Sequence, residues 1–560
     1  MRRPLGACST VHPGLPEVIP FLPDLRHLRL LLAPAVMTVG AMMCGEVVAA
    51  DYTVLEARAD QAREAWKIPG IAIAVVSTDG TLYSLGSGVR DVAAPARVDA
   101  DTRFLIGSVS KSLSAAVVGT YVDQGRLRWD DRVVDHLPWF RLSDPWVGAE
   151  TRIEDVLSHR VGVEATDWMD DVPGLSWRES VGRLRYLPQA QPFRTSLLYD
   201  NFMYSVGGQI INEIDHDYVD AARTRLFAAT GMSRTLADFE RVVDPRGLAA
   251  CNECEIVGAG LSPARAARNI DNVSLPHVVV GDVAVASAWR HQSSVSAGST
   301  LSSAHDLGRY LRMLLGRGQI DGRRVLSEAT VAELFRPRIF SPGRRPAAAD
   351  DVAGQRIAQW GQSYALGLFA GQYAGERVLH HSGGMLGASA QIALLPERRI
   401  GVVVLANQRN LDGNATVALL YEALDLALGL PTVDWITRLR PRAEGRTEDG
   451  EGAAARTTAA TTRLADASVV GDFCHRAYGV VHVRQTEDGL RVDQGPERVG
   501  ALTRDRDGGF VLRWNGPRNG PITIDFDLSA RGTPLAIRFG DVRFPACPAA
   551  SSAAPESSRW

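Results

Sequence analysis

The stretch IGSVSKSLSAAV, residues 106–117, contains Lys111, one of only two lysines in a chain of 560 residues. The other lysine is Lys67, and every other long basic side chain is an arginine. A general preference for arginine does not explain why a lysine stands three residues after Ser108. We therefore ask what Lys111 can do at this position that an arginine cannot.

The Ser-x-x-Lys spacing of Ser108 and Lys111 is typical of a nucleophile and its base. If a helix begins near Ser108, residues i and i+3 lie on one face of it. The free N–H groups and the positive end of the helix dipole favour an oxyanion at this serine. A desolvated lysine in cationic surroundings loses its proton well below its usual pKa of about 10.4, whereas arginine stays protonated. The spacing predicts a serine nucleophile with a lysine base; the alternative is a solvated helix lysine.

Other catalytic patterns are missing from the sequence. It contains no G-x-S-x-G elbow, no H-E-x-x-H zinc motif and no glycine-rich phosphate loop. The formal net charge of −3 argues against a nucleic-acid binder, and 45% apolar with 22% charged residues is ordinary for a globular protein. We therefore expect a small-molecule or peptide substrate, no metal, no cofactor and no nucleic-acid partner.

The order of β-type and helical patterns predicts an α+β fold for residues 51–437. Residues 71–89 form a predicted hairpin around Asp79 and Gly80, and residues 389–408 form a second one. Helical patterns with many turns fill residues 130–330, and residues 414–430 read as a closing helix. The simplest arrangement is one antiparallel sheet that joins early and late strands, flanked by helices, with an inserted helical domain and a cleft between them.

The rest of the chain predicts a linker and a second domain. Residues 438–468 are rich in Ala, Thr, Gly and charge, as linkers are. Residues 469–560 alternate short β-type runs with turns, which predicts a small all-β, barrel-like domain with a short disordered tail. Cys474 and Cys547 lie near its two ends and are placed to tie it closed. Cys251 and Cys254 lack the spacing of a zinc site, which leaves a local disulfide or free thiols.

Residues 1–50 are expected to be an N-terminal extension and a signal peptide. A basic start at Arg26 precedes an apolar stretch, and Val48 and Ala50 have the small side chains of a cleavage site before Asp51. The apolar stretch is short for a spanning helix. A cleaved secretory signal is favoured over a membrane anchor or a buried helix. We therefore expect an exported protein, periplasmic or extracellular, and leave a transient membrane or cell-wall association open.

Three motifs in order carry a family resemblance. Residues 104–138, FLIGSVSKSLSAAVVGTYVDQGRLRWDDRVVDHLP, resemble the active-serine segment of class C β-lactamase-like serine hydrolases. That group also holds penicillin-binding carboxypeptidases, D-aminopeptidases and family VIII-type esterases. IEDVLSHRVGVE (153–164), LLYDNFMYSVGGQII (197–211) and HHSGGMLGASAQ (380–391) are similar to its later segments. The resemblance covers about residues 52–430 and implies a β-lactamase/transpeptidase-like fold; the final domain resembles the lipocalin-like β domain appended to many of these proteins.

The resemblance also implies residue roles. Ser108 would be acylated, Lys111 would take its proton, and Tyr199 would be a second acid/base. Backbone N–H groups of Ser108 and Gly384 would form the oxyanion hole. The implied substrate-binding positions are Asn201, His381, Ser382, Gly383 and Gly384. Taken singly, Tyr199 is better read as a core residue, Asn201 as a turn residue and His381 as a satisfied strand histidine. The three motifs in this order favour the functional roles instead.

Two departures from the family bear on the substrate. His381 stands where typical β-lactamases have the lysine of K-T-G, and an imidazole titrates near neutral pH instead of keeping a fixed charge. Arg160 and Val161 replace the usual Thr and Ser. The leading prediction is an exported serine hydrolase that acts on a D-amino-acid peptide, a β-lactam or a small ester. The alternatives are a carboxylesterase of the same fold and a non-hydrolytic peptidoglycan-binding or scaffold homologue.

Overall fold

The computed structural model describes residues 50–164, 169, 172, 175–241, 271–280, 283–287, 289, 292–341, 351–408, 414–440, 466–495, 498–505, 508–515, 521–540 and 542–548. All of these residues belong to one unit of the chain, which spans residues 50–560. The predicted signal sequence, the Cys251–Cys254 pair, most of the predicted linker and the C-terminal tail lie outside the described residues. Within the described ranges, no helix has the length and apolar character needed to cross a membrane.

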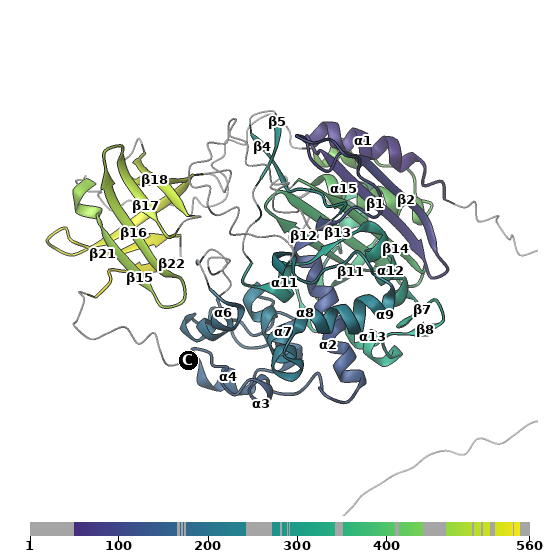
Figure 1. Ribbon diagram of the computed structural model, residues 1–560, viewed down its shortest axis with the longest axis horizontal. Coiled ribbons are helices and arrows are strands. Elements are labelled where there is room, and N and C mark those ends of the chain that lie inside the picture. Colours follow the sequence, from purple (N-terminus) through teal and green to yellow (C-terminus); the bar gives the residue numbers. More distant parts are fainter. Residues whose placement is uncertain are drawn as a thin grey trace, which may run out of the picture. The chain divides into compact units, whose positions relative to one another are not determined.

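The first part of the chain is built on an eight-stranded sheet in which all neighbouring strands are antiparallel (Figure 1). Early and late strands meet one strand in from an edge of the sheet, where Ile71 lies opposite Ala406 and Val75 opposite Val402. Both predicted hairpins are present in it. The strands, in spatial order, are β2 (Thr81–Gly88), β1 (Gly70–Ser77), β14 (Ile400–Ala406), β13 (Ala388–Leu395), β12 (Glu376–Met385), β11 (Phe369–Tyr373), β10 (Ser363–Tyr364) and β9 (Ile339–Phe340).

Side-chain alternation gives this sheet two buried faces. In β1, Ile71 and Val75 pack with one cluster that contains the apolar faces of α1 (Val54–Trp66), α15 (Asn414–Ala427) and α16 (Trp435–Leu439). Their neighbours Ala72, Ala74 and Val76 pack on the other side with α12 (Ala304–Leu315) and the helical region. Because both faces are covered, β1 is apolar along nearly its whole length.

In the sequence, the helical region falls between the early strands β1 and β2 and the late strands of the sheet. Its central helix, α2 (Ser110–Asp123), is buried all round from Ser110 to Tyr121 and follows a 3-10 turn at Gly107–Val109. The other helices are α3 (Val133–His136), α4 (Pro145–Glu150), α5 (Ile153–Leu157), α6 (Trp177–Arg183), α7 (Asn201–Asp215), α8 (Tyr218–Ala221), α9 (Ala228–Thr230), α11 (Val295–Gly298), α13 (Glu328–Phe335) and α14 (Val352–Ile357). Short pairs join β3 (Phe104–Leu105) to β6 (Leu301–Ser302), β4 (His277–Val280) to β5 (Val283–Ala286) and β7 (Gln319–Ile320) to β8 (Arg323–Arg324).

The C-terminal part is a second eight-stranded antiparallel sheet that is nearly closed into a barrel. Its strands follow chain order: β15 (Gly471–His475), β16 (Gly479–Thr486), β17 (Gly489–Asp493), β18 (Val499–Arg504), β19 (Phe510–Trp514), β20 (Ile522–Leu528), β21 (Pro534–Phe539) and β22 (Val542–Pro545). The last strand returns to the first: Phe473 bridges Ala546, and the Cys547 N–H donates to the Asp472 carbonyl over 2.8 Å.

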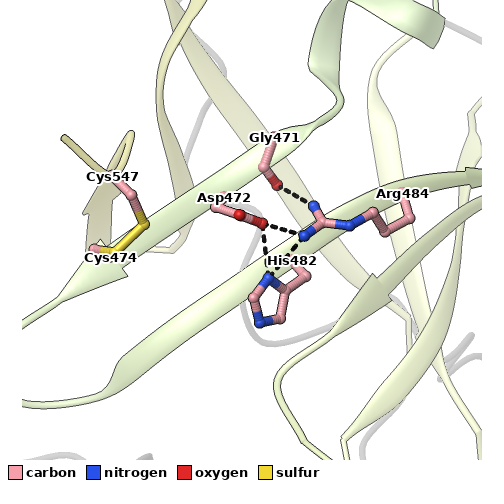
Figure 2. Close-up of a disulfide and its surroundings, with 6 residues drawn as sticks. All are labelled: Gly471, Asp472, Cys474, His482, Arg484 and Cys547. Atoms are coloured by element: carbon pink, nitrogen blue, oxygen red, sulfur yellow. Dashed lines mark hydrogen bonds and ion pairs between the residues drawn. A yellow bond between two sulfur atoms is a disulfide. The ribbon is translucent and has the colours of Figure 1, made fainter. Parts of the chain in front are cut away.

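A disulfide joins Cys474 to Cys547 at this seam, a link that the sequence permitted but left undecided (Figure 2). Beside it, the Asp472 carboxylate accepts from His482 Nδ1 at 2.7 Å and from Arg484 at 2.5 Å, and all three side chains are well exposed. The barrel therefore carries this ion-paired group on its outside. The α+β prediction, with its inserted helical region and its barrel-like C-terminal part, is confirmed.

Candidate active site

The turn that leads into α2 brings Ser108 and Lys111 together. The Nζ of Lys111 lies 3.0 Å from Ser108 Oγ, as the spacing of three residues on a helical turn requires. Ser108 is half-buried, whereas Lys111 is fully buried, with 0% of its surface exposed. The hydroxyl is thus within reach of a substrate while the amine lies beneath it, away from water.

Two further acceptors surround the Lys111 amine. Its Nζ lies 2.6 Å from Asn201 Oδ1 and 3.1 Å from the Ala297 carbonyl oxygen, and 4.8 Å from the centre of the Tyr199 ring. The Lys111 amine donates to all three oxygens, and a protonated amine has the three N–H bonds that this requires. Once it has lost its proton, the amine keeps two N–H bonds for Asn201 and Ala297 and has a lone pair for the Ser108 hydroxyl. In that neutral form it can accept a proton from the serine.

Asn201 reaches the lysine because α7 begins at that residue. The Asp200 carboxylate caps the helix by accepting from the N–H groups of Phe202 and Met203 at 2.8 and 3.1 Å. The predicted contact of Asn201 with a substrate amide stays a prediction, since its Oδ1 accepts from Lys111.

The third motif lies on β12, packed backbone to backbone against the turn of Ser108. A Cβ on Gly383 would lie 1.8 Å from the Ile106 carbonyl oxygen and 3.2 Å from the Ser108 nitrogen. A Cβ on Gly107, whose φ is +49°, would lie 2.7 Å from the nitrogen of Gly384. Only glycine allows this approach. It brings the two peptide segments of the predicted oxyanion hole together, and Gly384 remains exposed.

His381 is buried and fully engaged within the protein, although Ser382 beside it is exposed. Its Nδ1 lies 2.6 Å from the Ser382 carbonyl, which can only accept, so this nitrogen carries the proton. Its Nε2, 3.0 Å from the Tyr364 hydroxyl, is then the acceptor. Burial, followed by the charge of Lys111, lowers the pKa of His381 to about 3. The expectation that His381 titrates near neutral pH is therefore wrong, because the position is desolvated.

His159 and Tyr364 belong to the site, and sequence reasoning assigned them no role. The His159 ring lies 4.1 Å from the Tyr199 ring, centre to centre, and 4.9 Å from that of Tyr364. The Tyr199 and His381 rings are 6.2 Å apart. These aromatic side chains form the wall around the Lys111 amine. His159 could have been singled out from the sequence, because it lies in the LSHR segment directly before the unusual Arg160.

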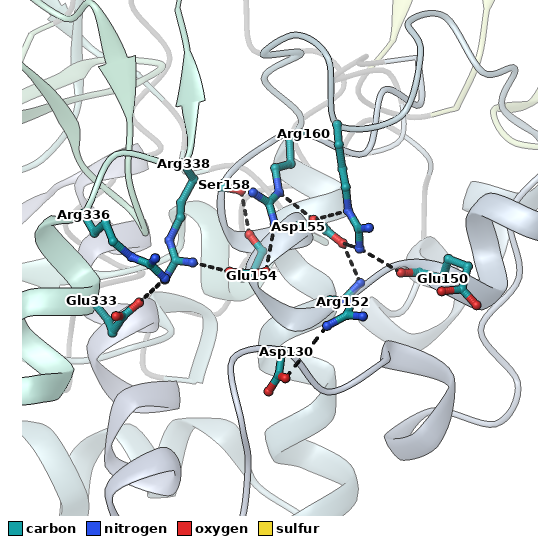
Figure 3. Close-up of polar contacts among 11 residues, drawn as sticks. Asp130, Glu150, Arg152, Glu154, Asp155, Ser158, Arg160, Glu333, Arg336 and Arg338 are labelled. Carbon is teal, nitrogen blue, oxygen red and sulfur yellow. Dashed lines mark hydrogen bonds and ion pairs between the residues drawn. The ribbon is translucent and has the colours of Figure 1, made fainter. Parts of the chain in front are cut away.

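Arg160 takes part in a network of ion pairs beside the site (Figure 3). The Asp155 carboxylate, fully buried, accepts from Arg160 Nε at 2.5 Å and from Arg194 at 2.6 Å. Arg160 also pairs with Glu154 at 2.9 Å, and Glu154 in turn pairs with Arg338. A charge at position 160 is thus compensated twice, which explains how the departure from Thr fits the fold.

Histidines elsewhere have other surroundings. His277 is completely buried, accepts from the Val92 N–H over 3.3 Å and contacts the Asn407 carbonyl over 3.2 Å, so it holds main-chain segments together. Within the described residues, no three His, Cys, Asp or Glu side chains are grouped as a metal site would need.

Comparisons with known proteins agree with this geometry. The family model described as Beta-lactamase matches residues 55–427. Among curated relatives, the unguisins hydrolase ungD of Aspergillus violaceofuscus is 28% identical over 394 residues, which is 67% of this chain and 64% of the hydrolase. Penicillin-binding protein 4 of Amycolatopsis lactamdurans is 30% identical over 348 residues, 60% of this chain and 83% of that protein.

A solved structure matches most of the chain at the level of fold. The octameric penicillin-binding protein homologue from Pyrococcus abyssi covers 88% of this chain and 99% of its own, with a TM-score of 0.56 and 19% identity. The chain spans less than two thirds of the length of the unguisins hydrolase that it resembles.

Proposed function

The chain belongs to the beta-lactamase family, a family of serine hydrolases, and from this premise we propose that it cleaves amide or ester bonds through an acyl-enzyme at Ser108. The observation that carries the proposal is the surroundings of the Lys111 amine. Its Nζ lies 3.0 Å from Ser108 Oγ, and the oxygens of Asn201 and Ala297 can hold the two N–H bonds that remain when the amine loses its proton. Arginine would be protonated at this position and would have no lone pair to offer.

In the proposed acylation step, Ser108 Oγ attacks the carbonyl carbon while its proton passes to Lys111 Nζ. The negative charge that develops on the carbonyl oxygen would be met by the N–H groups of Ser108 and Gly384. The bond to the leaving amine or alcohol then breaks, and the leaving group takes up a proton through Tyr199 and Lys111. Water then attacks the acyl carbon and gives one proton to the base, the bond between the acyl carbon and Ser108 Oγ breaks, and the base returns that proton to Oγ as the acid product leaves.

Covalent labelling tests the nucleophile directly. We expect a fluorophosphonate probe to label the wild type and to leave Ser108→Ala unlabelled. Ser110→Ala is the matched control: Ser110 is two residues away and completely buried, and its Oγ accepts from the Thr300 N–H at 3.3 Å. Labelling of Ser108→Ala at the wild-type rate would rule the proposal out.

A carboxylesterase is the second candidate, and His381 favours it. Family members with lysine at this position present a fixed positive charge to a substrate carboxylate. Here the imidazole is neutral, and both of its nitrogens are occupied by Ser382 and Tyr364. A substrate without a carboxylate would make no ion pair at this position in any case, so a neutral imidazole does not weaken its binding. This supports neutral esters or amides as substrates over β-lactams.

A substrate panel ranks these candidates. We expect short acyl p-nitrophenyl esters and D-alanyl amides to be hydrolysed with a higher kcat/KM than nitrocefin, which carries a carboxylate. His381→Lys is expected to narrow that gap. Nitrocefin as the best substrate of the wild type would contradict the esterase candidate and leave acylation of Ser108 in place.

We also propose that the protein works outside the cytoplasm, as a periplasmic or extracellular enzyme that can associate transiently with membrane or cell wall. The Cys474–Cys547 disulfide supports this, because disulfides persist in oxidising compartments. Alkaline phosphatase fused to residues 1–50 is expected to become active in a bacterial host. An inactive fusion that is nevertheless expressed would contradict export.

A further inference from the structure

One residue, His159, accepts hydrogen bonds from both sides of Tyr199. The Leu198 N–H donates to the His159 carbonyl over 2.9 Å, and the Asp200 N–H donates to His159 Nδ1 over 3.1 Å. These two N–H groups belong to the residues immediately before and after Tyr199. The backbone that carries the tyrosine is therefore held at two points by a residue 40 positions earlier in the chain.

The His159 ring also supports the phenol itself. It is tilted by 30° to the Tyr199 ring, and the two ring centres are 4.1 Å apart. The ring centres of Tyr204 and Tyr364 lie 5.3 and 4.9 Å from that of His159. Only 1% of His159 is exposed, whereas Tyr199 is half-buried. A rigid buried ring thus backs a phenol that is itself accessible to substrate.

His159 is fixed in turn by its neighbours in the chain. Its φ of +57° is unusual for a residue other than glycine and persists only where the surroundings impose it. The next residue, Arg160, donates its N–H to the Asp155 carbonyl and accepts at its own carbonyl from the Arg194 N–H over 2.8 Å. Both arginine side chains bind the buried Asp155 carboxylate (Figure 3). The ion-pair network therefore holds the backbone on which His159 stands.

The state of the imidazole agrees with this geometry. An N–H of the main chain can only donate, so Nδ1 must be unprotonated to accept from Asp200. Burial, followed by the charge of Lys111, keeps the pKa of His159 well below its usual range. The acceptor is thus available at neutral pH.

We propose that His159 is the positioning residue of Tyr199, holding its phenol beside the Lys111 amine without itself touching the reacting atoms. The inference rests on the proposed function, in which Tyr199 transfers a proton. According to this proposal, the LSHR segment affects the rate of proton transfer by Tyr199 and does not bind the substrate.

A double-mutant cycle tests the proposal on the full-length protein. His159→Phe keeps a ring but removes the Nδ1 acceptor. We expect it to lower kcat/KM for the preferred substrate of the panel by about 100-fold, as misplacement of a catalytic group does, with KM nearly unchanged. In the Tyr199→Phe background, the same substitution is expected to change kcat/KM by less than about twofold, because nothing remains to be positioned.

A conservative variant provides the rescue. Asparagine offers a side-chain oxygen near the place of Nδ1 and tolerates positive φ. We expect His159→Asn to recover kcat/KM to within about tenfold of the wild type. Where His159→Phe does not fold, the same cycle is run with His159→Gly, which tolerates the positive φ and also lacks the acceptor: we expect a loss in the wild-type background and none with Tyr199→Phe.

The barrel contains a matched control. His475 stacks on Tyr478 at 4.4 Å and 17°, and its Nδ1 accepts from the Ala477 N–H over 3.1 Å, so His475→Phe makes the same chemical change. We expect it to leave kcat/KM unchanged. If the fold-loss of kcat/KM in the His159→Phe/Tyr199→Phe double variant equals the product of the losses in the two single variants, the proposal is overturned. Failure of the proposed function has another signature, namely a wild type whose labelling does not depend on Ser108.

Discussion

The two eight-stranded sheets of this protein both bury polar side chains, but in different settings. The first sheet is covered on both faces, and Lys111, His159 and His381 are buried around the proposed site, His381 on β12 itself. The barrel fills its interior with side chains such as Val481, Leu512 and Phe544 and carries the Asp472 ion pairs on its outside. Burying polar groups costs free energy unless each finds a partner. In the barrel the buried Arg498 donates to the buried Gln494 over 2.9 Å, whereas the first sheet buries its polar groups where the chemistry is proposed.

The largest effect is expected from Lys111→Arg. It keeps the charge but removes the lone pair, so labelling of Ser108 should slow on the order of 10³- to 10⁴-fold, the range of general base catalysis. Stopped-flow or gel-based labelling measures the rate, and circular dichroism checks that the variant is folded. Turnover close to that of the wild type would show that Lys111 is not the base.

Opening the barrel should affect stability and not activity. Cys474 and Cys547 are 73 residues apart, so the chain-entropy model gives the disulfide about 4 kcal/mol of the free energy of unfolding at 25 °C. We expect the double variant Cys474→Ser/Cys547→Ser to lose free energy of unfolding of this order in the barrel, measured by calorimetry. We expect its kcat/KM to equal that of the wild type. A loss of kcat/KM in this variant would mean that the activity of the first region depends on the stability of the barrel.

Breaking the buried ion pairs beside the site should cost more than breaking exposed ones on the barrel. Asp155→Asn leaves Arg160 and Arg194 without their shared carboxylate, which is expected to cost about 3 kcal/mol. Asp472→Asn is the matched control, because its partners are exposed and such pairs contribute about 1 kcal/mol or less. Chemical denaturation of both variants measures the difference. Equal losses would remove the contrast between the two sheets.

The smallest effect concerns pH. The pKa of His381 is about 3 in the folded protein, below the usual value near 6.5, so the unfolded state binds more protons between these values. The stabilising contribution is present above pH 6.5 and is lost as the pH falls, by about 2 kcal/mol for His381 alone at pH 5. Unfolding curves at pH 7 and pH 5 should show this loss, and His381→Asn should show less of it. In the barrel, burial lowers the pKa of His475 as well, but that ring is only half-buried.

Much of the fold was predictable because it rests on local patterns. The apolar runs of β1 and of the β13–β14 hairpin and the turn at Asp79 and Gly80 each identify their element. The proximity of Ser108 and Lys111 follows from helix geometry alone. These are interactions between near neighbours, or periodicities that any single sequence displays.

Other features of the site were not predictable in this way. His159 and Tyr199 are 40 residues apart, Lys111 and Ala297 are 186 apart, and nothing in the local pattern pairs them. The titration of His381 was misjudged because the residue type is visible in the sequence whereas its burial is not. Arg160 was recognised as unusual, but its partner Asp155 became evident only through the network.

By itself, then, the sequence determined the two sheets, the helical insertion between the strands of the first, and the placing of a serine one helical turn before a rare lysine. Only the tertiary structure decided the electrostatic state of the site: which acceptors surround Lys111, why His381 is neutral, and how His159 holds Tyr199. The physical reason is that desolvation and hydrogen bonding depend on neighbours from distant parts of the chain, which no local pattern specifies.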